Sequence, residues 1–288
     1  MGSFLPARVC PLLLVDGHHL LWSATFGFPA EIRSRDKSRE LTGAFAFFAL
    51  LRCVVRDDLD TTAPEIIVVF DGEQGSAARQ TEDVDYKANR PTTPEALKPL
   101  QFLQPVKDGL DAFGYAWMEI ENAEADDSIA TLARAHPDRP VRIMSGDQDY
   151  YQLLDTDNVR IINRSRNAGK RVIGPEEVTG RFKVTPAQWA DYRSLTGDPS
   201  DNIPGVRGVG PGAAAKYLAG GLTLDELPES GRLTGTKGQA VHDAWGDVLR
   251  WRDMIRMRTD VPVTAHPTGL PSPELPKAAD IIAKLGLW

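Results

Sequence analysis

Short apolar runs that end in aspartate constrain the fold of this chain more than any other feature. Leu12–Val15 precedes Asp16, and Ile66–Phe70 precedes Asp71. Apolar runs of this length, rich in β-branched residues, are typical of buried strands. Longer segments with helical periodicity, such as Leu41–Val55, lie between them. Alternating strands and helices predict a mostly parallel central sheet flanked by helices, and ligands bind at the carboxyl edge of such sheets.

The same reasoning predicts an α/β region over residues 1–174 and a helical region over 175–288. A polar segment at 73–94 interrupts the alternation, and Pro91 and Pro94 close it. The further predicted elements are strands at 115–120 and 141–144, helices at 97–113, 124–135, 150–154 and 278–285, and a hairpin pairing 159–162 with 171–173.

Nine acidic residues lie beside the predicted strand and helix ends. If they converge, like charges raise each other's pKa, so the site needs cations. Sites built only from oxygen ligands favour hard divalent ions such as Mg²⁺ or Mn²⁺. The nine residues are Asp16, Asp71, Glu124, Asp126, Asp127, Asp147, Asp149, Asp198 and Asp201.

The spacing of these residues predicts how they point. Glu124 and Asp127 are three apart at a helix start, so we expect them to share a face while Asp126 points elsewhere. Asp147 and Asp149 are two apart beyond a strand and can aim the same way. Taken alone, each cluster is also compatible with helix capping or an Asx turn. Four clusters at one sheet edge favour a site for two metal ions, which suits phosphodiester hydrolysis.

A glycine-rich segment follows the last acidic pair. Gly205, Gly208 and Gly210 let the backbone approach a ligand closely, and Arg207 and Lys216 add positive charge. The pattern over about 195–219 predicts a helix–hairpin–helix, which holds a DNA backbone phosphate without reading bases. A glycine-rich turn between two packed helices is the alternative.

The polar segment carries Arg79, Lys87 and Arg90. A basic segment beside an acidic site can hold a phosphate chain. A solvated loop with incidental charges is the alternative. His18 and His19 follow Asp16 directly, and we expect them to pack or hydrogen-bond rather than bind metal.

Composition is compatible with a nucleic-acid partner. The net charge is −7, but nine of the 40 acidic residues belong to the clusters, which leaves 31 against 33 basic residues. The two cysteines, Cys10 and Cys53, form no C-x-x-C pair, so we expect free thiols. No run is long enough to span a membrane, and no signal-peptide pattern is present. We therefore expect a soluble, cytoplasmic protein.

Several motifs together resemble one family, the 5′-nuclease domain of bacterial DNA polymerase I and of stand-alone bacterial and phage flap endonucleases. The resemblance runs from about Leu12 to Val263, with the motifs in the same order, and the absence of a polymerase region suggests a stand-alone member. The motifs are VDGHHLLW, VVFDGE, DYKANRPTTP, EADDSIATLA, SGDQDYYQLL, LTGDPSDNIPGVRGVGPGAA and IRMRTDVPV.

The resemblance implies a PIN-like 5′-nuclease fold with a helical arch at about 73–96. It implies two or more Mg²⁺ or Mn²⁺ ions, with the first five acidic residues serving one metal cluster and the last four serving the other. Lys87 and Arg90 would act at the scissile phosphate, and Arg79 would contact DNA. The helix–hairpin–helix would hold duplex DNA, with a monovalent cation such as K⁺.

The implied activity is 5′-3′ exonuclease and flap endonuclease cleavage of flapped, nicked or gapped DNA by a monomer in the nucleoid. Candidate partners are the polymerase and ligase of replication and repair. Two positions depart from the family pattern: Ser23 stands where an arginine is usual, with Arg33 or Arg35 as candidate replacements, and Ala78 precedes Arg79 where an aromatic residue is common.

Three other functions are compatible with parts of the pattern. A related metal-dependent RNase would have a similar acidic sheet edge, but the helix–hairpin–helix argues against it. A non-catalytic DNA-junction binder would gain nothing from nine acids that face phosphates. An aspartyl phosphatase would need a D-x-D-x-T arrangement, which VFDGE lacks.

Overall fold

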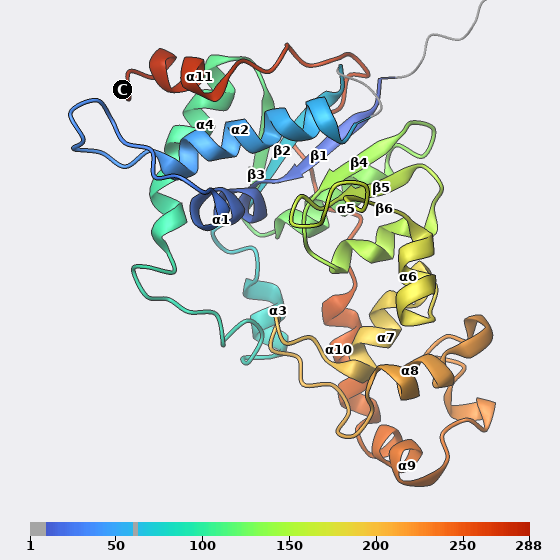
Figure 1. Ribbon diagram of the computed structural model, residues 1–288. Coiled ribbons are helices and arrows are strands. Elements are labelled where there is room, and N and C mark those ends of the chain that lie inside the picture. Colours follow the sequence, from blue (N-terminus) through green and yellow to red (C-terminus); the bar gives the residue numbers. More distant parts are fainter. Residues whose placement is uncertain (1–9, 60–62) are drawn as a thin grey trace, which may run out of the picture.

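The computed structural model describes residues 10–59 and 63–288. Its centre is a six-stranded sheet in the order β3-β2-β1-β4-β5-β6, in which every neighbouring pair is parallel except β5 and β6 (Figure 1). The predicted α/β class and the final hairpin are therefore confirmed. The strands are β1 (Leu12–Asp16), β2 (Glu65–Asp71), β3 (Ala116–Ile120), β4 (Val141–Met144), β5 (Val159–Ile162) and β6 (Val172–Ile173).

Alternate residues of the strands enter two separate cores, because side chains of a strand point to opposite faces in turn. Leu13 and Val15 pack with α1 (Gly17–Gly27), α2 (Thr42–Asp57) and α4 (Leu103–Ala112) on one face. Leu12 and Leu14 pack on the other face, which α5 (Ala125–Arg134) and the 3₁₀ helix η2 (Asp149–Asp155) cover. The second core continues without a break into the helical part of the molecule.

That helical part forms the lower half of Figure 1 and contains the predicted helix–hairpin–helix. Its helices pack around Trp189, Leu218 and Trp251. They are α6 (Pro175–Phe182), α7 (Trp189–Thr196), α8 (Pro211–Tyr217), α9 (Gly235–Asp243) and α10 (Trp245–Ile255), with short 3₁₀ helices η3 (Pro186–Gln188), η4 (Ala219–Gly221) and η5 (Pro228–Ser230).

The chain then returns to the α/β part, so the region 175–288 does not stay together as predicted. The Ser272 amide donates to the Pro64 carbonyl at 3.0 Å, and the Ile66 amide donates to Ser272 Oγ at 2.9 Å. The last helix, α11 (Ala278–Lys284), packs its buried Ile281 and Ile282 into the core of α2 and α4. The pattern of apolar residues predicts that α11 is a helix, but it does not show which half of the molecule this helix packs against.

The segment between β2 and α4 differs from prediction in its detail. Its helices are α3 (Ala77–Glu82) and the 3₁₀ helix η1 (Lys98–Phe102). Because η1 runs directly into α4, the helix predicted over 97–113 is confirmed as two consecutive helical segments. Pro105 lies in the first turn of α4 and has no amide hydrogen to donate to the Gln101 carbonyl of η1, so the regular α-helical ladder begins only with α4. Among the described residues, no helix is long and apolar enough to cross a membrane.

Candidate functional site

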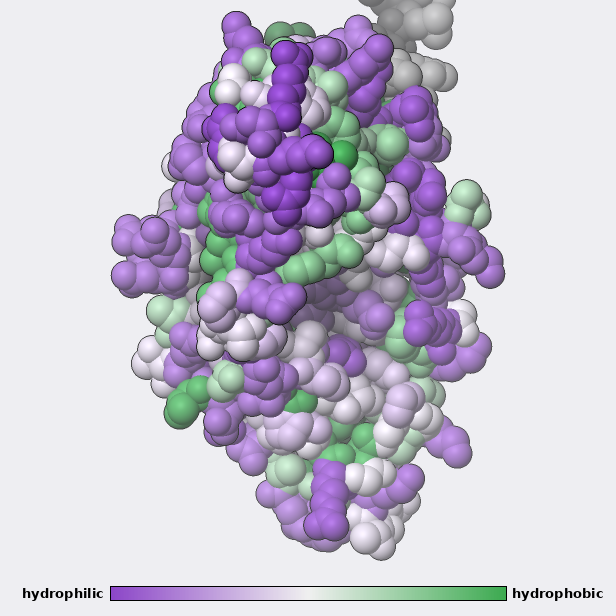
Figure 2. Space-filling model, turned by 60° about the vertical axis from the view of Figure 1, so that its left-hand side comes forward, coloured by the Kyte–Doolittle hydropathy of each residue, from purple (hydrophilic) through white to green (hydrophobic). Residues whose placement is uncertain are grey.

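Acidic side chains at or just beyond the ends of three strands and at the start of one helix line a cavity of about 500 Å³ at the carboxyl edge of the sheet. Parallel pairing of β2, β1 and β4 puts their last residues at the same edge, as predicted. Figure 2 shows the surface hollowed between the α/β and helical parts, with hydrophilic side chains over most of this face. The charged lining residues are Asp16, Asp71, Glu124, Asp126, Asp147, Lys87 and Arg90.

Hydrogen bonds hold the first two carboxylates in place. Asp16 caps α1, since the His19 amide donates to its Oδ1 at 3.0 Å, and its Oδ2 accepts from Ser145 Oγ at 3.0 Å. Asp71 Oδ1 accepts from the Ala125 amide at 2.7 Å. Each carboxylate is therefore fixed by a donor from a neighbouring element and keeps an edge toward the cavity.

The start of α5 points its acidic residues differently from the prediction. Glu124 is the N-cap, with extended backbone angles of φ −75° and ψ 155°, so helical spacing does not apply from it. Glu124 and Asp126 consequently share the cavity, whereas Asp127 is fully buried elsewhere.

Asp127 does not fit its predicted role as a metal ligand. Its Oδ1 accepts from Arg79 Nη2 at 2.9 Å and from the Arg258 amide at 2.8 Å. Its Oδ2 accepts from Arg79 Nη1 at 3.1 Å and from Arg258 Nε at 2.8 Å. Four donors leave this carboxylate no free direction, so it ties α5 to two distant arginines instead of binding an ion.

The position of Arg79 also disagrees with the prediction that this residue contacts DNA. Its side chain is 11% exposed and also pairs with Glu124. Its Nε donates to the Met254 carbonyl at 2.9 Å. The guanidinium therefore joins α3 to α5 and to the end of α10, and a signal for this role is absent from the local sequence.

The second acidic group lies around a neighbouring cavity of about 420 Å³, which Asp147 and Asp198 line. Asp147 lines both cavities and so connects them. Asp198 pairs with Arg193 at 2.7 Å. Asp149 and Asp201 are buried and line neither cavity. Asp149 accepts from Trp189 Nε1 at 3.4 Å.

The base of the segment 73–96 is fastened to the second group. Lys87 Nζ donates to Glu124 Oε1 and lies 3.8 Å from Asp201 Oδ1. Arg90 Nη2 donates to Asp201 Oδ1 at 3.0 Å. Asn89 Nδ2 donates to the Pro199 carbonyl at 2.8 Å. Lys87 and Arg90 thus lie against the carboxylates at the edge of the cavity.

Tyr86 is a site residue that the sequence reasoning missed. Its buried hydroxyl lies 3.0 Å from Glu124 Oε2 and 3.1 Å from Asp201 Oδ2, so it joins the two acidic groups. Burial, reinforced by Asp201 and Glu124, raises the pKa of this phenol far above its ordinary value, so it remains a donor. The signal was a tyrosine directly before Lys87 in DYKANR.

Charge in the cavity is only partly compensated. Burial and neighbouring carboxylates raise the pKa values of Asp71, Asp126, Asp147 and Asp149. Burial acts in the same direction on Glu124, but Lys87 and Arg79 outweigh it and lower the pKa of that carboxyl. In the described part of the chain, neither Asp126 nor Asp147 forms an ion pair.

These residues fit hard divalent ions. The donors are carboxylate oxygens, and two of the carboxylates, Asp126 and Asp147, form no ion pair within the described ranges. Within residues 10–59 and 63–288, no three acidic, histidine or cysteine side chains already converge on one point. Lys87, Arg90 and Arg193 instead hold Glu124, Asp201 and Asp198, and incoming ions would compete with these cations.

The predicted helix–hairpin–helix is built directly onto the second acidic group. Asp198 and Ile203 form an antiparallel bridge, and the Val206 amide donates to the Leu195 carbonyl at 2.9 Å. Gly205 and Gly208 have φ values of +68° and +83°, which favour glycine. Arg207, Gly210 and Lys216 are all exposed at or after this turn.

Ser23 stands where the family usually has an arginine, and the arginine that lines the same cavity is not one of the two expected replacements. Ser23 lines a cavity of about 270 Å³ together with Arg164, and neither Arg33 nor Arg35 lines it. Arg164 pairs with Asp58 at 2.6 Å. Arg33 pairs instead with Glu31 at 2.5 Å in the loop between α1 and α2.

Two family models match consecutive parts of the chain. Residues 11–183 match the 5′-3′ exonuclease, N-terminal resolvase-like domain, and residues 184–277 match the 5′-3′ exonuclease, C-terminal SAM fold. DNA polymerase I of Deinococcus radiodurans is 36% identical over 266 residues, covering 90% of this chain and 26% of that protein. The thermostable DNA polymerase I of Thermus thermophilus is 34% identical over 258 residues, covering 88% and 29%. The chain thus spans between a quarter and a third of these relatives.

Solved structures share the fold. The T5 D15 protein co-crystallised with metal ions superimposes with a TM-score of 0.68 at 21% identity, covering 96% of this chain and 94% of that one. The catalytic core of Rad2 in complex with DNA substrate gives a TM-score of 0.57 at 14% identity, covering 98% and 89%.

Proposed function

Because this chain belongs to the 5′-3′ exonuclease family, we propose that it is a divalent-metal-dependent 5′ nuclease that cleaves DNA near junctions of single strand and duplex. The observation that carries this proposal is the cavity at the sheet edge, where Asp126 and Asp147 lack a partner cation in the described structure. Such carboxylates can hold the metal ions that phosphodiester hydrolysis needs.

The ions in this proposal are two or more of Mg²⁺ or Mn²⁺. When bound, they would supply an activated water and stabilise the leaving oxygen. Asp16, Asp71, Glu124 and Asp126 would hold one group of ions, and Asp147, Asp149, Asp198 and Asp201 the other. Asp127 is left out because its four hydrogen bonds fix it elsewhere.

Lys87 and Arg90 have two roles in the proposed cycle. Without ions they neutralise Glu124 and Asp201. With ions held by Glu124 and Asp201, the ammonium and the guanidinium would be free to contact the scissile phosphate from the same side of the cavity. Placed there, the two cations would stabilise the negative charge that develops during cleavage.

The helix–hairpin–helix would hold the duplex beside this site, with Gly205, Gly208 and Gly210 close to the backbone and Arg207 and Lys216 on phosphates. We also propose that a K⁺ ion binds at this turn. The protein would be a monomer in the cytoplasmic nucleoid and would share a DNA intermediate with polymerase and ligase. Size-exclusion chromatography with light scattering tests the monomer, and comparing K⁺ with Na⁺ in a duplex-binding assay tests the ion.

Cleavage of end-labelled DNA tests the function. We expect flapped and nicked DNA to be cut near the junction with Mg²⁺ or Mn²⁺, and none to be cut with EDTA. Single-stranded RNA of the same sequence separates the RNase alternative, and Asp126→Asn is the matched inactive control. Efficient RNA cleavage, or DNA cleavage that persists in EDTA, would contradict the proposal.

A further inference from the structure

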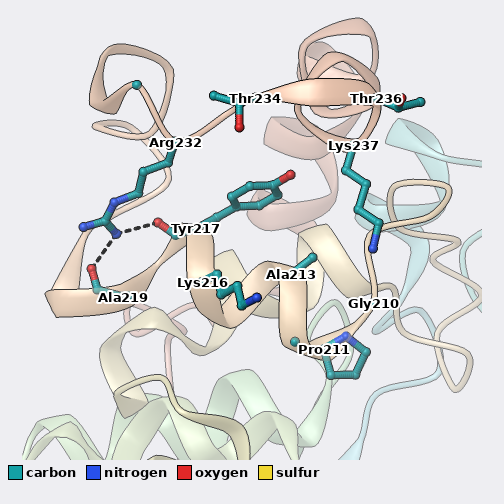
Figure 3. Close-up of a pocket in the computed structure, with 12 residues that line it drawn as sticks. Gly210, Pro211, Ala213, Lys216, Tyr217, Ala219, Arg232, Thr234, Thr236 and Lys237 are labelled. Carbon is teal, nitrogen blue, oxygen red and sulfur yellow. Dashed lines mark hydrogen bonds between the residues drawn. The ribbon is translucent and has the colours of Figure 1, made fainter.

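A second hollow, larger than the carboxylate cavity, lies on the helical part of the molecule. It measures about 1120 Å³ and opens between α8 and residues 231–237 at the start of α9 (Figure 3). We name it the α8–α9 hollow. Its lining includes Lys216, Arg232 and Lys237 and no acidic residue, although the chain carries a net charge of −7.

The two lysines of this hollow are free of carboxylate partners among the described residues. Both are exposed, and Figure 3 shows Lys237 reaching from the α9 side toward Gly210 and Pro211, with Lys216 on α8 facing the same space. Arg232 is already engaged, because its Nη1 donates to the Tyr217 carbonyl at 2.8 Å and to the Ala219 carbonyl at 2.5 Å. Arg232 therefore lines the hollow in a fixed position.

Hydroxyl groups complete the polar lining. Thr234 and Thr236 are exposed on the α9 wall, and the Thr234 side chain makes no capping hydrogen bond. Hydroxyls and unpaired lysines are the groups that contact phosphate and sugar in protein–DNA interfaces. An anionic chain is therefore the ligand that this lining suits.

We propose that the α8–α9 hollow binds the phosphate backbone of the duplex arm beyond the part that the helix–hairpin–helix holds. Gly210, Pro211 and Gly212 form one rim of the hollow and also end the hairpin, so a strand held at the hairpin leads directly into it. This continuity favours DNA over an acidic protein segment. The inference rests on the proposed function and adds a second stretch of backbone contact to it.

The proposal predicts a dependence on duplex length. Each phosphate that a lysine neutralises releases condensed counterions, which contributes about 0.9 to the slope of log affinity against log salt concentration. Only a duplex arm long enough to enter the hollow gains this contribution. Lys237→Gln should therefore reduce the slope by about 1 for long arms. It should leave the shortest bound arms unchanged.

Fluorescence anisotropy in EDTA, with flapped DNA whose duplex arm is lengthened stepwise, separates binding from cleavage. For the wild-type protein we expect a step to higher affinity at a certain arm length, and for Lys237→Gln we expect a smaller step. Lys277→Gln, an exposed lysine at the start of α11 on the α/β part, is the matched control and should keep the step. With saturating long-armed flap and Mg²⁺, the maximal cleavage rate of Lys237→Gln should equal that of the wild type.

Two results would overturn the inference. One is a wild-type step and salt slope in Lys237→Gln, and the other is an equal loss of affinity at every arm length. Equal thermal unfolding midpoints of the two lysine variants establish that both are folded. If the wild-type protein binds no duplex of any length, the proposed function itself fails, and that outcome is distinct from a missing step.

Discussion

At the residue scale, neighbouring carboxylates of α5 have opposite roles. Asp126 lines the cavity with no ion pair in the described structure, and Asp127 lies between two arginines. We expect Asp126→Asn to reduce cleavage by more than about 100-fold, since even changes in groups behind a metal ligand cost about 10–100-fold. DNA binding should stay largely intact. Single-turnover cleavage and anisotropy measure the two effects separately.

Asp149→Asn should behave in the same way, because Asp149 belongs to the second acidic group. Full activity in either purified variant would show that the metal ligands are assigned wrongly.

Asp127 should matter for stability instead of metal binding. Removing one partner of a buried ion pair costs about 3–5 kcal/mol, because the remaining charge is left without compensation. Asp127→Ala leaves the charges of Arg79 and Arg258 without this carboxylate partner. Urea unfolding should show the loss, and isothermal titration below the unfolding temperature should still detect Mg²⁺ binding. Loss of Mg²⁺ binding in a folded variant would return Asp127 to the metal site.

The raised pKa values of the cavity carboxyls make stability depend on pH. For Asp71, Asp126, Asp147 and Asp149 the folded-state pKa lies above the ordinary 3.8, so the folded protein binds protons more tightly than the unfolded chain. Their contribution is complete below the unfolded pKa and is lost as pH rises through the folded pKa. Carboxyls with lowered pKa values, such as Glu124, are already ionised in both states above about pH 5.

Above about pH 5 the metal-free protein should therefore melt at a lower temperature as the pH rises. Mg²⁺ should remove most of this decrease, and Asp126→Asn should reduce it without Mg²⁺. Each kcal/mol changes the melting temperature by about 2–4 °C in a protein of this size class. Differential scanning calorimetry in EDTA measures the effect, and a metal-free protein that is more stable at pH 8 than at pH 6 would contradict it.

At the scale of elements, the turn after α7 depends on a close approach of two backbones. A Cβ at Gly205 would lie 2.3 Å from the Gly197 nitrogen, at a φ of +68°. Gly210 has φ −89° and nothing within 4 Å of an added Cβ. We expect Gly205→Ala to destabilise the protein by more than about 2 kcal/mol, since overpacking and left-handed strain add.

Gly210→Ala is the matched control and should stay within about 0.5 kcal/mol of the wild type. Thermal unfolding measures both variants. A Gly205→Ala protein that is as stable as Gly210→Ala would mean that the two backbones lie further apart than described.

At the scale of the whole molecule, α11 ties the end of the chain to the α/β part. Ile281 is fully buried beside Gly109 of α4. Ile281→Ala should lower the free energy of unfolding by about 2–5 kcal/mol, as for other buried aliphatic truncations. Denaturant unfolding gives the value, and duplex binding at 10 °C should be unchanged because α11 lies away from the helix–hairpin–helix (Figure 1). A loss below 1 kcal/mol would place α11 outside the core.

Local pattern predicted the features that depend on local sequence. The apolar runs before Asp16 and Asp71 gave the strands, and parallel connection gave the common edge. The partners of Asp127 could not be predicted, because Arg258 is 131 residues away and Arg79 is 48 residues away. The direction of the Asp126 side chain could not be predicted either, because it depends on Glu124 being the N-cap and not the first helical residue. The docking of α11 needs knowledge of which apolar face is left uncovered.

The bridge between Asp198 and Ile203, described above as part of the site, also limits how this protein can be re-engineered. The helix–hairpin–helix residues proposed to hold DNA and two of the acidic residues lie on one continuous stretch of chain, and the Gly197–Gly205 contact closes it into a unit. A chimera that takes its hairpin from a relative must therefore take those carboxylates and their spacing as well. Crossover points should lie before α7 or after α8, and never between Thr196 and Gly210.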